Sequence, residues 1–313
     1  MIIKTKIILV CLLFSCISCS GNNETAKQHD SKQQAEIIPE ADTGVLDFTM
    51  FYSTEEDELI FDDYISQIKE SEHGQMADVI IKTARFFLGK PYTASTLEFE
   101  PEGLVINLRE FDCTTFVESV LALSITVEKY DYPTFDDFCT QLQYIRYRKG
   151  TINDYTSRLH YFSDWIYENE TFGFVKDITK EVGGEPYKPE LSFISSHPDS
   201  YKQLKSNPEY AEIIQRKEQE ISKRDIYTFI PEAKINSCKK EIKDGDIICF
   251  VTDIKGLDVS HVGFAYHNSG ELTFIHASTS AKKVIINPQP LLSYVKNNRR
   301  NTGIIVVRPT GIN

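Results

Sequence analysis

The chain has 313 residues, of which 41% are hydrophobic and 26% are charged, a balance typical of a protein that folds around a buried core. Its 46 acidic residues outnumber its 34 lysines and arginines, and the formal net charge of −12 argues against bulk electrostatic binding of nucleic acid. The sequence holds no apolar run of the roughly 18 residues that a transmembrane helix needs.

Residues 1–19 have the layout of a secretory signal peptide, in which lysines precede an apolar stretch that ends in small residues and cysteines. Cys16 and Cys19 both lie in contexts that resemble the bacterial lipobox, whose cysteine is lipidated after cleavage. Cys19 is the favoured site, and ordinary cleavage without a lipid is the alternative. We therefore expect an exported protein that is anchored to the cell envelope by this lipid alone and faces the periplasm.

Residues 20–45 are polar and nearly free of aromatics, so they are predicted to form a flexible tether. No internal repeat and no Gly-rich or Ser-rich run divides residues 46–313, which are expected to form one domain with an insertion at about 130–240. In an oxidising compartment its cysteines could form two disulfides, although so sparse a framework is not required for stability. These cysteines are Cys113, Cys139, Cys238 and Cys249.

Hydrophobic spacing predicts helices in the first part of this domain and strands in the last. The expected helices cover 55–70, 76–88, 113–127 and 208–224, with further helical patterns between 130 and 240. From residue 245 onward short β-rich runs alternate with turn residues, at 246–251, 261–266, 272–277, 283–287 and 303–307. Helices followed by an antiparallel sheet predict an α+β fold.

Cys113 is expected in the first turn of a helix that Asp112 caps, since an aspartate at this position accepts hydrogen bonds from free backbone amides. Unpaired amides and the positive end of the helix dipole favour the thiolate, so Cys113 is a candidate nucleophile. Taken alone, a buried structural cysteine is the more common interpretation. A nucleophile also needs a base within reach.

Two histidines, His261 and His276, lie in neighbouring predicted strands of one hairpin. A loop of Asn268–Ser269 would place them directly opposite each other, and a loop of Ser269–Gly270 would place them diagonally on the same face. His261 could then serve as base while His276 fixes its tautomer. The alternatives are a packed pair of core histidines and a zinc site, but no metal-binding spacing is present and no cofactor is expected.

Several short motifs, in this order along the chain, resemble the NlpC-type cell-wall cysteine hydrolases. They are Gly89-Lys90-Pro91-Tyr92, Asp112-Cys113, Gly245-Asp246-Ile247-Ile248, His261-Val262-Gly263 and Ile275-His276-Ala277. The resemblance implies a papain-like fold, with the nucleophile at a helix N-terminus packed on an antiparallel sheet. It also implies that Cys113 is the nucleophile, that His261 and His276 assist it, and that Tyr92 lines the site or helps hold the oxyanion.

This sequence departs from the family pattern in two respects. Thr114 and Thr115 follow the cysteine in place of Ser and Gly, and about 130 residues separate Cys113 from Gly245, where ordinary members have a few tens. The long insert, with 144–148 and 155–165, together with Leu108-Arg109-Glu110-Phe111-Asp112-Cys113, resembles a branch whose characterised members are N-acetylmuramoyl-L-alanine amidases.

The resemblance therefore implies cleavage between the lactyl group of the glycan and the stem peptide, and muropeptides as partners. A γ-D-glutamyl endopeptidase acting inside the stem peptide and a non-catalytic, lipid-tethered wall-binding protein are the alternatives.

The insert also concentrates positive charge, since Arg146, Arg148, Lys149 and Arg158 fall within thirteen residues of an acidic chain. Guanidinium groups bind carboxylates in bidentate fashion, and stem peptides carry several carboxylates. We therefore expect the insert to form part of the substrate site, with Arg158 and His160 as contacts. A solvated helix face with packed aromatic side chains is the alternative.

Overall fold

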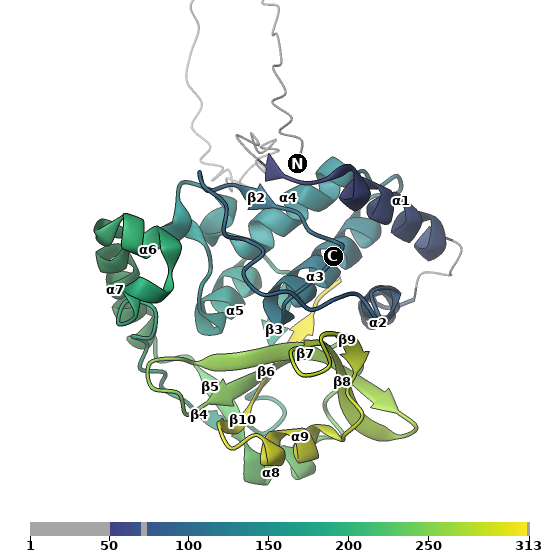
Figure 1. Cartoon of the computed structure of the whole chain (residues 1–313). Coiled ribbons are helices and arrows are strands. Elements are labelled where there is room, and N and C mark those ends of the chain that lie inside the picture. Colours follow the sequence, from purple (N-terminus) through teal and green to yellow (C-terminus); the bar gives the residue numbers. More distant parts are fainter. Residues whose placement is uncertain (1–50, 70–73, 312–313) are drawn as a thin grey trace, which may run out of the picture. The chain divides into compact units, whose positions relative to one another are not determined.

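The structure, a computed structural model, describes residues 51–69 and 74–311 (Figure 1). The predicted signal peptide at 1–19, the lipidation site Cys19 and the tether at 20–45 lie outside the described residues. Among the described helices, none is long and apolar enough to cross a membrane. The cysteines of the described residues, which could have formed two disulfides, are all free thiols.

Helices form the upper part of the molecule in Figure 1 and surround a central helix, α3. They are α1 (Glu55–Lys69), α2 (Met76–Phe86), α3 (Cys113–Lys129), α4 (Phe135–Arg146) and α5 (Phe162–Thr171), beside a small parallel sheet of β1 (Phe51–Tyr52) and β2 (Leu104–Val105). Every residue of α3 from Thr115 to Val127 is buried, as its largely apolar sequence predicts. Apolar spacing thus located α1, α2 and α3 to within a few residues, whereas the bounds of α4 and α5 were not predicted.

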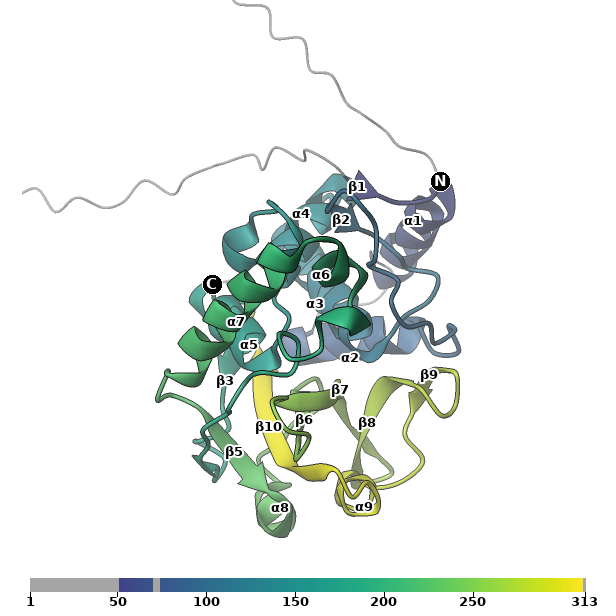
Figure 2. The ribbon, with the colours of Figure 1, turned by 60° about the vertical axis from the view of Figure 1, so that its left-hand side comes forward.

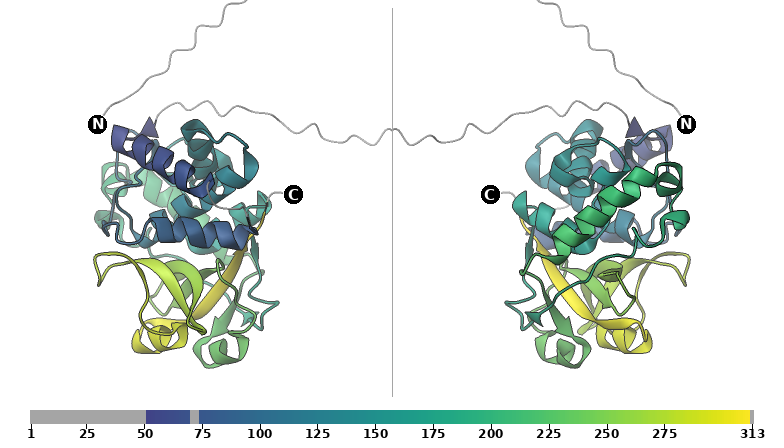
Figure 3. Two further views of the ribbon diagram at one scale, coloured as in Figure 1. Left: turned by 90° about the vertical axis from the view of Figure 1, so that its right-hand side faces the viewer. Right: turned by 90° about the vertical axis from the view of Figure 1, so that its left-hand side faces the viewer.

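Within the described residues, eight strands form one antiparallel sheet. Its order is β4 (Glu185–Pro186), β5 (Thr228–Pro231), β10 (Asn301–Pro309), β6 (Ile247–Thr252), β7 (Val259–Asn268), β8 (Glu271–Ser278) and β9 (Lys283–Ile286), and β3 (Val175–Asp177) also pairs with β10. Figures 2 and 3 show this strongly twisted sheet below most of the helices, with α8 and α9 beneath it. The architecture is therefore mixed α/β.

The sheet is covered on both faces. On one face Phe264 packs edge-on against Phe116 of α3, with ring centroids 5.9 Å apart. On the other face Phe250, Phe274 and Ile304 join a buried apolar cluster with the short helices α8 (Glu232–Cys238) and α9 (Leu291–Asn297). Figure 1 shows α3 on one side of the sheet and α8 and α9 on the other.

The insertion at about 130–240 is less purely helical than expected. It contributes β3, β4 and β5 to the sheet. Its helices are α4, α5, α6 (Lys202–Ser206), α7 (Pro208–Ser222) and α8, and it also holds three 3-10 turns, at Arg148–Gly150, Tyr155–Ser157 and Pro198–Ser200. These strands have two to four residues each, too few for an alternating pattern to be recognised. The pairing of β3 and β5 with β10 is also remote in sequence, and β4 pairs with β5.

Candidate active site

The β7–β8 hairpin fixes the relation between the two predicted site histidines. Asn268 pairs with Glu271, so the loop is Ser269–Gly270, and both loop residues have positive φ, as a tight two-residue hairpin turn requires. This is the second of the two expected registers. It places His261 and His276 diagonally on one face.

The two imidazoles are in direct contact, with Nε2 of His261 2.6 Å from Nδ1 of His276 in a shared hydrogen bond. Their rings are nearly perpendicular, and His276 is only 2% exposed. Burial lowers the pKa of His261 to about 4, and burial together with the neighbouring His261 lowers the pKa of His276 to about 3. Both rings are therefore neutral at pH 7.

Cys113 is the first residue of α3, and Asp112 is its N-cap, as predicted. The Asp112 carboxylate accepts from the Thr115 amide at 2.8 Å, while the Thr115 hydroxyl accepts from the Asp112 amide at 2.9 Å. This reciprocal pair defines where the helix begins, because it satisfies donors that have no partner within the helix. It thereby fixes the sulfur at the helix tip.

The tip of α3 lies against β7 at the residue after His261. The backbone of Val262 is close enough to the Cys113 sulfur to stabilise its thiolate, and Thr114 does the same. Burial nevertheless outweighs these contributions, and with the charge of Asp112 it raises the pKa of the Cys113 thiol to about 12. This direction is opposite to the expectation that the helix terminus favours the thiolate, because burial disfavours a charged sulfur.

Tyr92 also lies in this region. A parallel bridge joins it to Phe111, and its amide donates to the Lys282 carbonyl at 2.9 Å. Burial raises the pKa of Tyr92, a hydrogen bond with Thr279 lowers it, and the neighbouring Cys113 and Asp112 side chains raise it further. The structure thus brings Tyr92 close to Cys113.

Two further side chains border the histidines and were missed by the sequence analysis. Tyr294 of α9 packs against both rings, with centroids 6.2 Å from His261 and 6.0 Å from His276, and burial, together with the neighbouring Cys113, raises its pKa. No motif marks Tyr294, which only the docking of α9 brings to the site.

Asn287 is the other missed neighbour. Its amide donates to the Phe274 carbonyl at 2.8 Å, which continues the β8–β9 register, so its side chain lies diagonal to His276 on the same face. Nε2 of His276 is buried without a hydrogen bond of good geometry, and the Asn287 side chain raises the pKa of His276. The same register arithmetic that paired the histidines could have found Asn287.

The predicted substrate contacts in the insert are engaged inside the protein. Arg158 binds Glu102 through Nε and Nη2 at 2.6 and 2.9 Å, and it also binds Glu98 at 3.1 Å. His160 shares a hydrogen bond with the Tyr155 carbonyl at 2.8 Å, and burial lowers its pKa to about 4.

The other insert arginines are also paired, Arg146 with Glu118 at 2.6 Å and Arg148 with Asp164 at 2.5 Å. Carboxylates therefore neutralise the guanidinium groups of the insert, and the expected open cationic pocket is not formed by them. The acidic partners could not be chosen from the sequence, because they lie up to 60 residues away. Among the described residues, no group of three His, Cys, Asp or Glu side chains is arranged to hold a metal ion.

The chain is similar to proteins of a known family. The N-acetylmuramoyl-L-alanine amidase-like family, termed AmiA-like, matches residues 82–304. The chain belongs to the AmiA-like family. Among curated proteins, none matches this AmiA-like chain.

Solved structures resemble the AmiA-like chain closely. An N-acetylmuramoyl-L-alanine amidase from Bacteroides uniformis is 40% identical, with a TM-score of 0.72 over 76% of this chain and 100% of that one. A Bacteroides fragilis protein named as a candidate xylanase is also 40% identical, with a TM-score of 0.69 over 72% of this chain and 99% of that one. A Legionella pneumophila protein at 21% identity, with a TM-score of 0.61 over 82% of this chain and 93% of that one, shares the fold.

Proposed function

We propose that this protein is a peptidoglycan hydrolase that cleaves the amide between the lactyl group of N-acetylmuramic acid and L-alanine, with Cys113 as nucleophile in a papain-like, NlpC-type site. The observation that carries the proposal is the meeting of three segments. The α3 tip places the Cys113 sulfur against Val262, and the preceding His261 is hydrogen-bonded to His276. Membership of the AmiA-like family supports the choice of bond.

The resting pair is a neutral thiol and a neutral imidazole, so activation requires proton transfer during attack. His261 takes the thiol proton as the sulfur adds to the lactyl carbonyl carbon. Backbone N–H groups at the start of α3 and the Tyr92 hydroxyl stabilise the oxyanion that forms. His261 then protonates the amine of L-alanine as the C–N bond breaks, and water hydrolyses the thioester with His261 acting as base again.

His276 and Asn287 set which nitrogen of His261 is the base. The Asn287 amide donates to the Gln289 carbonyl at 2.8 Å, which leaves its oxygen as acceptor toward Nε2 of His276. When Nε2 of His276 carries the proton, Nδ1 of His276 is the acceptor. Nε2 of His261 is therefore protonated and donates the hydrogen bond between the two rings. Nδ1 of His261 is then free to take the proton of Cys113.

We further propose that residues 1–19 direct export and that Cys19 carries a lipid, so that the catalytic domain works on a tether facing the periplasm. The supporting observations are the lysines, apolar stretch and cysteines of the leader. Mass spectrometry of the protein extracted from membranes should find a diacylated N-terminal cysteine at position 19. A Cys19→Ala variant should lose both the lipid and the membrane fraction.

Mass spectrometry of products from defined muropeptides tests the activity. The wild type should release the N-acetylmuramic acid sugar free of peptide, and Cys113→Ala should retain less than about one thousandth of the turnover with unchanged thermal stability. A sugar that still carries L-Ala-D-Glu would instead identify the endopeptidase. Muropeptide binding without turnover, unaffected by alkylation of Cys113, would identify a wall-binding protein.

A further inference from the structure

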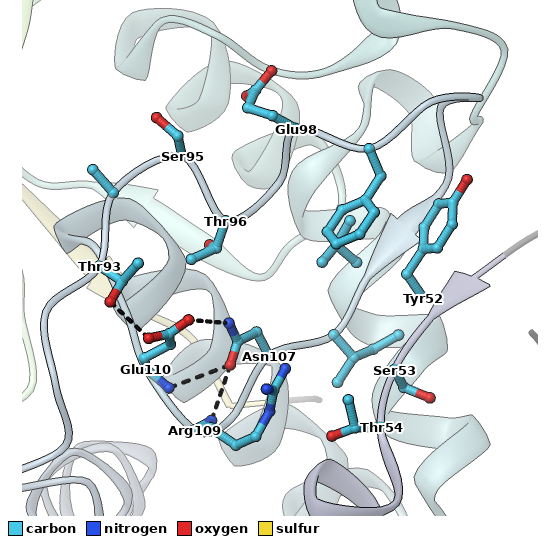
Figure 4. A pocket seen from close by; sticks show the side chains of 14 residues that line it. Tyr52, Ser53, Thr54, Thr93, Ser95, Thr96, Glu98, Asn107, Arg109 and Glu110 are labelled. Atoms are coloured by element: carbon cyan, nitrogen blue, oxygen red, sulfur yellow. Dashed lines mark hydrogen bonds between the residues drawn. The ribbon is translucent and has the colours of Figure 1, made fainter. Parts of the chain in front are cut away.

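A pocket of about 440 Å³ lies beside the candidate active site and is not accounted for by the catalytic groups. Its walls come from three segments, 52–54, 93–99 and 105–110. Figure 4 shows Thr93, Glu110 and Arg109 on one side of the pocket and Tyr52 on the other. The pocket therefore combines hydroxyl groups, both signs of charge and an aromatic wall.

Short chain segments connect this pocket to the site. Glu110 precedes Cys113 by three residues and Thr93 follows Tyr92. The Thr93 amide donates to the Phe111 carbonyl at 2.9 Å and the Phe111 amide donates to the Pro91 carbonyl at 3.0 Å, which holds the two segments together. Since an extended chain covers at most about 3.5 Å per residue, the Glu110 backbone lies within about 11 Å of Cys113. A peptide of about three residues covers that distance.

Arg109 supplies the cation of the pocket, and its guanidinium is held in a fixed orientation. Nε binds Asp57 at 3.1 Å, and the fully buried Asp57 is itself held by the Leu108 amide at 2.8 Å and by Thr54. The Arg109 side chain is 33% exposed. In the part of the chain that the structure describes, neither of its Nη atoms has a hydrogen-bond partner, unlike the bidentate Arg158.

Glu110 supplies the anion. Its carboxylate accepts from the Thr93 hydroxyl at 2.7 Å and from the Asn107 amide at 3.5 Å, and both donors are neutral. Asp57 already balances the charge of Arg109, so a ligand that brought only a carboxylate would meet the uncompensated charge of Glu110. A ligand that carries an ammonium and a carboxylate together satisfies both groups, because each charged hydrogen bond then has its partner.

We propose that this pocket binds the zwitterionic end of a diamino acid in the stem peptide, with its carboxylate on Arg109 and its ammonium on Glu110. The proposal rests on the proposed function, since it treats the stem peptide as the substrate. The aromatic and aliphatic wall, including Tyr52, Phe99 and Val105, receives the methylene chain that links this end to the peptide backbone. The pocket thereby selects the residue near the third stem position.

Steady-state kinetics on three N-acetylmuramoyl tripeptides tests the proposal. Their third residues are meso-diaminopimelate, its side-chain carboxamide, and L-lysine, which keeps the ammonium and lacks the carboxylate. The wild type should show a KM about 10- to 100-fold lower for the meso-diaminopimelate substrate, as expected for a charged hydrogen-bonded pair. Arg109→Gln should raise that KM to the level of the other two substrates without changing kcat.

Two variants serve as controls. Arg109→Lys keeps the charge and loses the bidentate geometry, so its KM should be intermediate. Arg85→Gln removes another arginine, whose Nη1 binds the Tyr266 hydroxyl at 2.9 Å, and should change no KM. An equal rise of KM for all three peptides in Arg109→Gln, or the same wild-type KM for all three, would overturn the proposal.

The binding proposal can fail or hold independently of the reaction. If the wild type releases no amidase product, calorimetric titration of the three peptides into the inactive Cys113→Ala variant gives the same comparison as dissociation constants. A preference for the meso-diaminopimelate peptide that disappears in the Cys113→Ala, Arg109→Gln double variant supports the pocket even then. Equal dissociation constants reject it.

Discussion

Gly263 offers a sharp test of how the histidine pair is positioned. The β7–β8 register continues to place it opposite His276. A methyl group added at Gly263 would lie 2.7 Å from the Ile275 carbonyl oxygen and 3.0 Å from Cβ of His276. Ordinary contacts of this kind are about 3.5 Å, so these neighbours must move by roughly half an ångström. A third contact, at 3.0 Å, is with Cδ2 of Phe274. The Ile275 carbonyl belongs to the backbone of the sheet, so His276 and Phe274 take much of the displacement.

The Gly263→Ala substitution should therefore cost about 2 kcal/mol of unfolding free energy, a typical penalty for overpacking. It should lower kcat by about tenfold, because reacting groups tolerate displacements of less than an ångström. The assays are urea unfolding and amidase turnover at a temperature where all variants are folded.

Gly303→Ala is the matched control for this substitution. Its methyl would meet the Ile230 carbonyl and the Phe229 ring on β5, and no contact of that methyl involves a site histidine. It should destabilise the protein with little change in kcat. Equal kcat losses in the two variants, or no loss in Gly263→Ala, would refute the claim that this glycine serves the position of His276.

Two further predictions concern the same groups. Asn287→Ala should lower kcat by about 10- to 100-fold with KM unchanged. In a His276→Ala background the same substitution should have no further effect, because Asn287 acts through that ring. Additive losses of kcat would assign Asn287 a separate role. Burial lowers the pKa of His261 to about 4 in the folded protein, against 6.5 in the unfolded chain. As the pH falls from 6.5 to 4, the unfolded chain binds a proton at this histidine that the folded protein does not, so the free energy of unfolding should decrease. Urea unfolding at pH 7 and at pH 4.5 should show a loss of about 2 kcal/mol that is smaller in His261→Gln, and an equal loss in both proteins would contradict this assignment.

Local patterns identified the elements that carry the candidate site. The apolar run after Asp112 predicts α3 and its cap, since capping involves residues only three apart. The alternating runs predict β7 and β8, and a two-residue loop limits the hairpin to registers that leave His261 and His276 on one face. These inferences hold because each depends on interactions between residues that are close in sequence.

Other features depend on which distant segments meet, and the sequence does not contain that information in a local form. Four arginines and lysines in the insert looked like an open cationic surface, yet Arg158 is neutralised by Glu98 and Glu102. Arg109 faces the pocket of about 440 Å³, and the sequence indicated it only as part of a motif and not as a candidate contact.

The sequence by itself determined the longer helices and strands, the family motifs and the three residues proposed for catalysis, because these follow from short-range periodicity and from types of side chain. Only the tertiary structure decided how these groups are charged and what surrounds them. Burial at the junction of α3 and β7 raises the pKa of the Cys113 thiol to about 12, although Cys113 lies at a helix tip. Solvation depends on every segment that covers a group, and no neighbouring stretch of sequence specifies it.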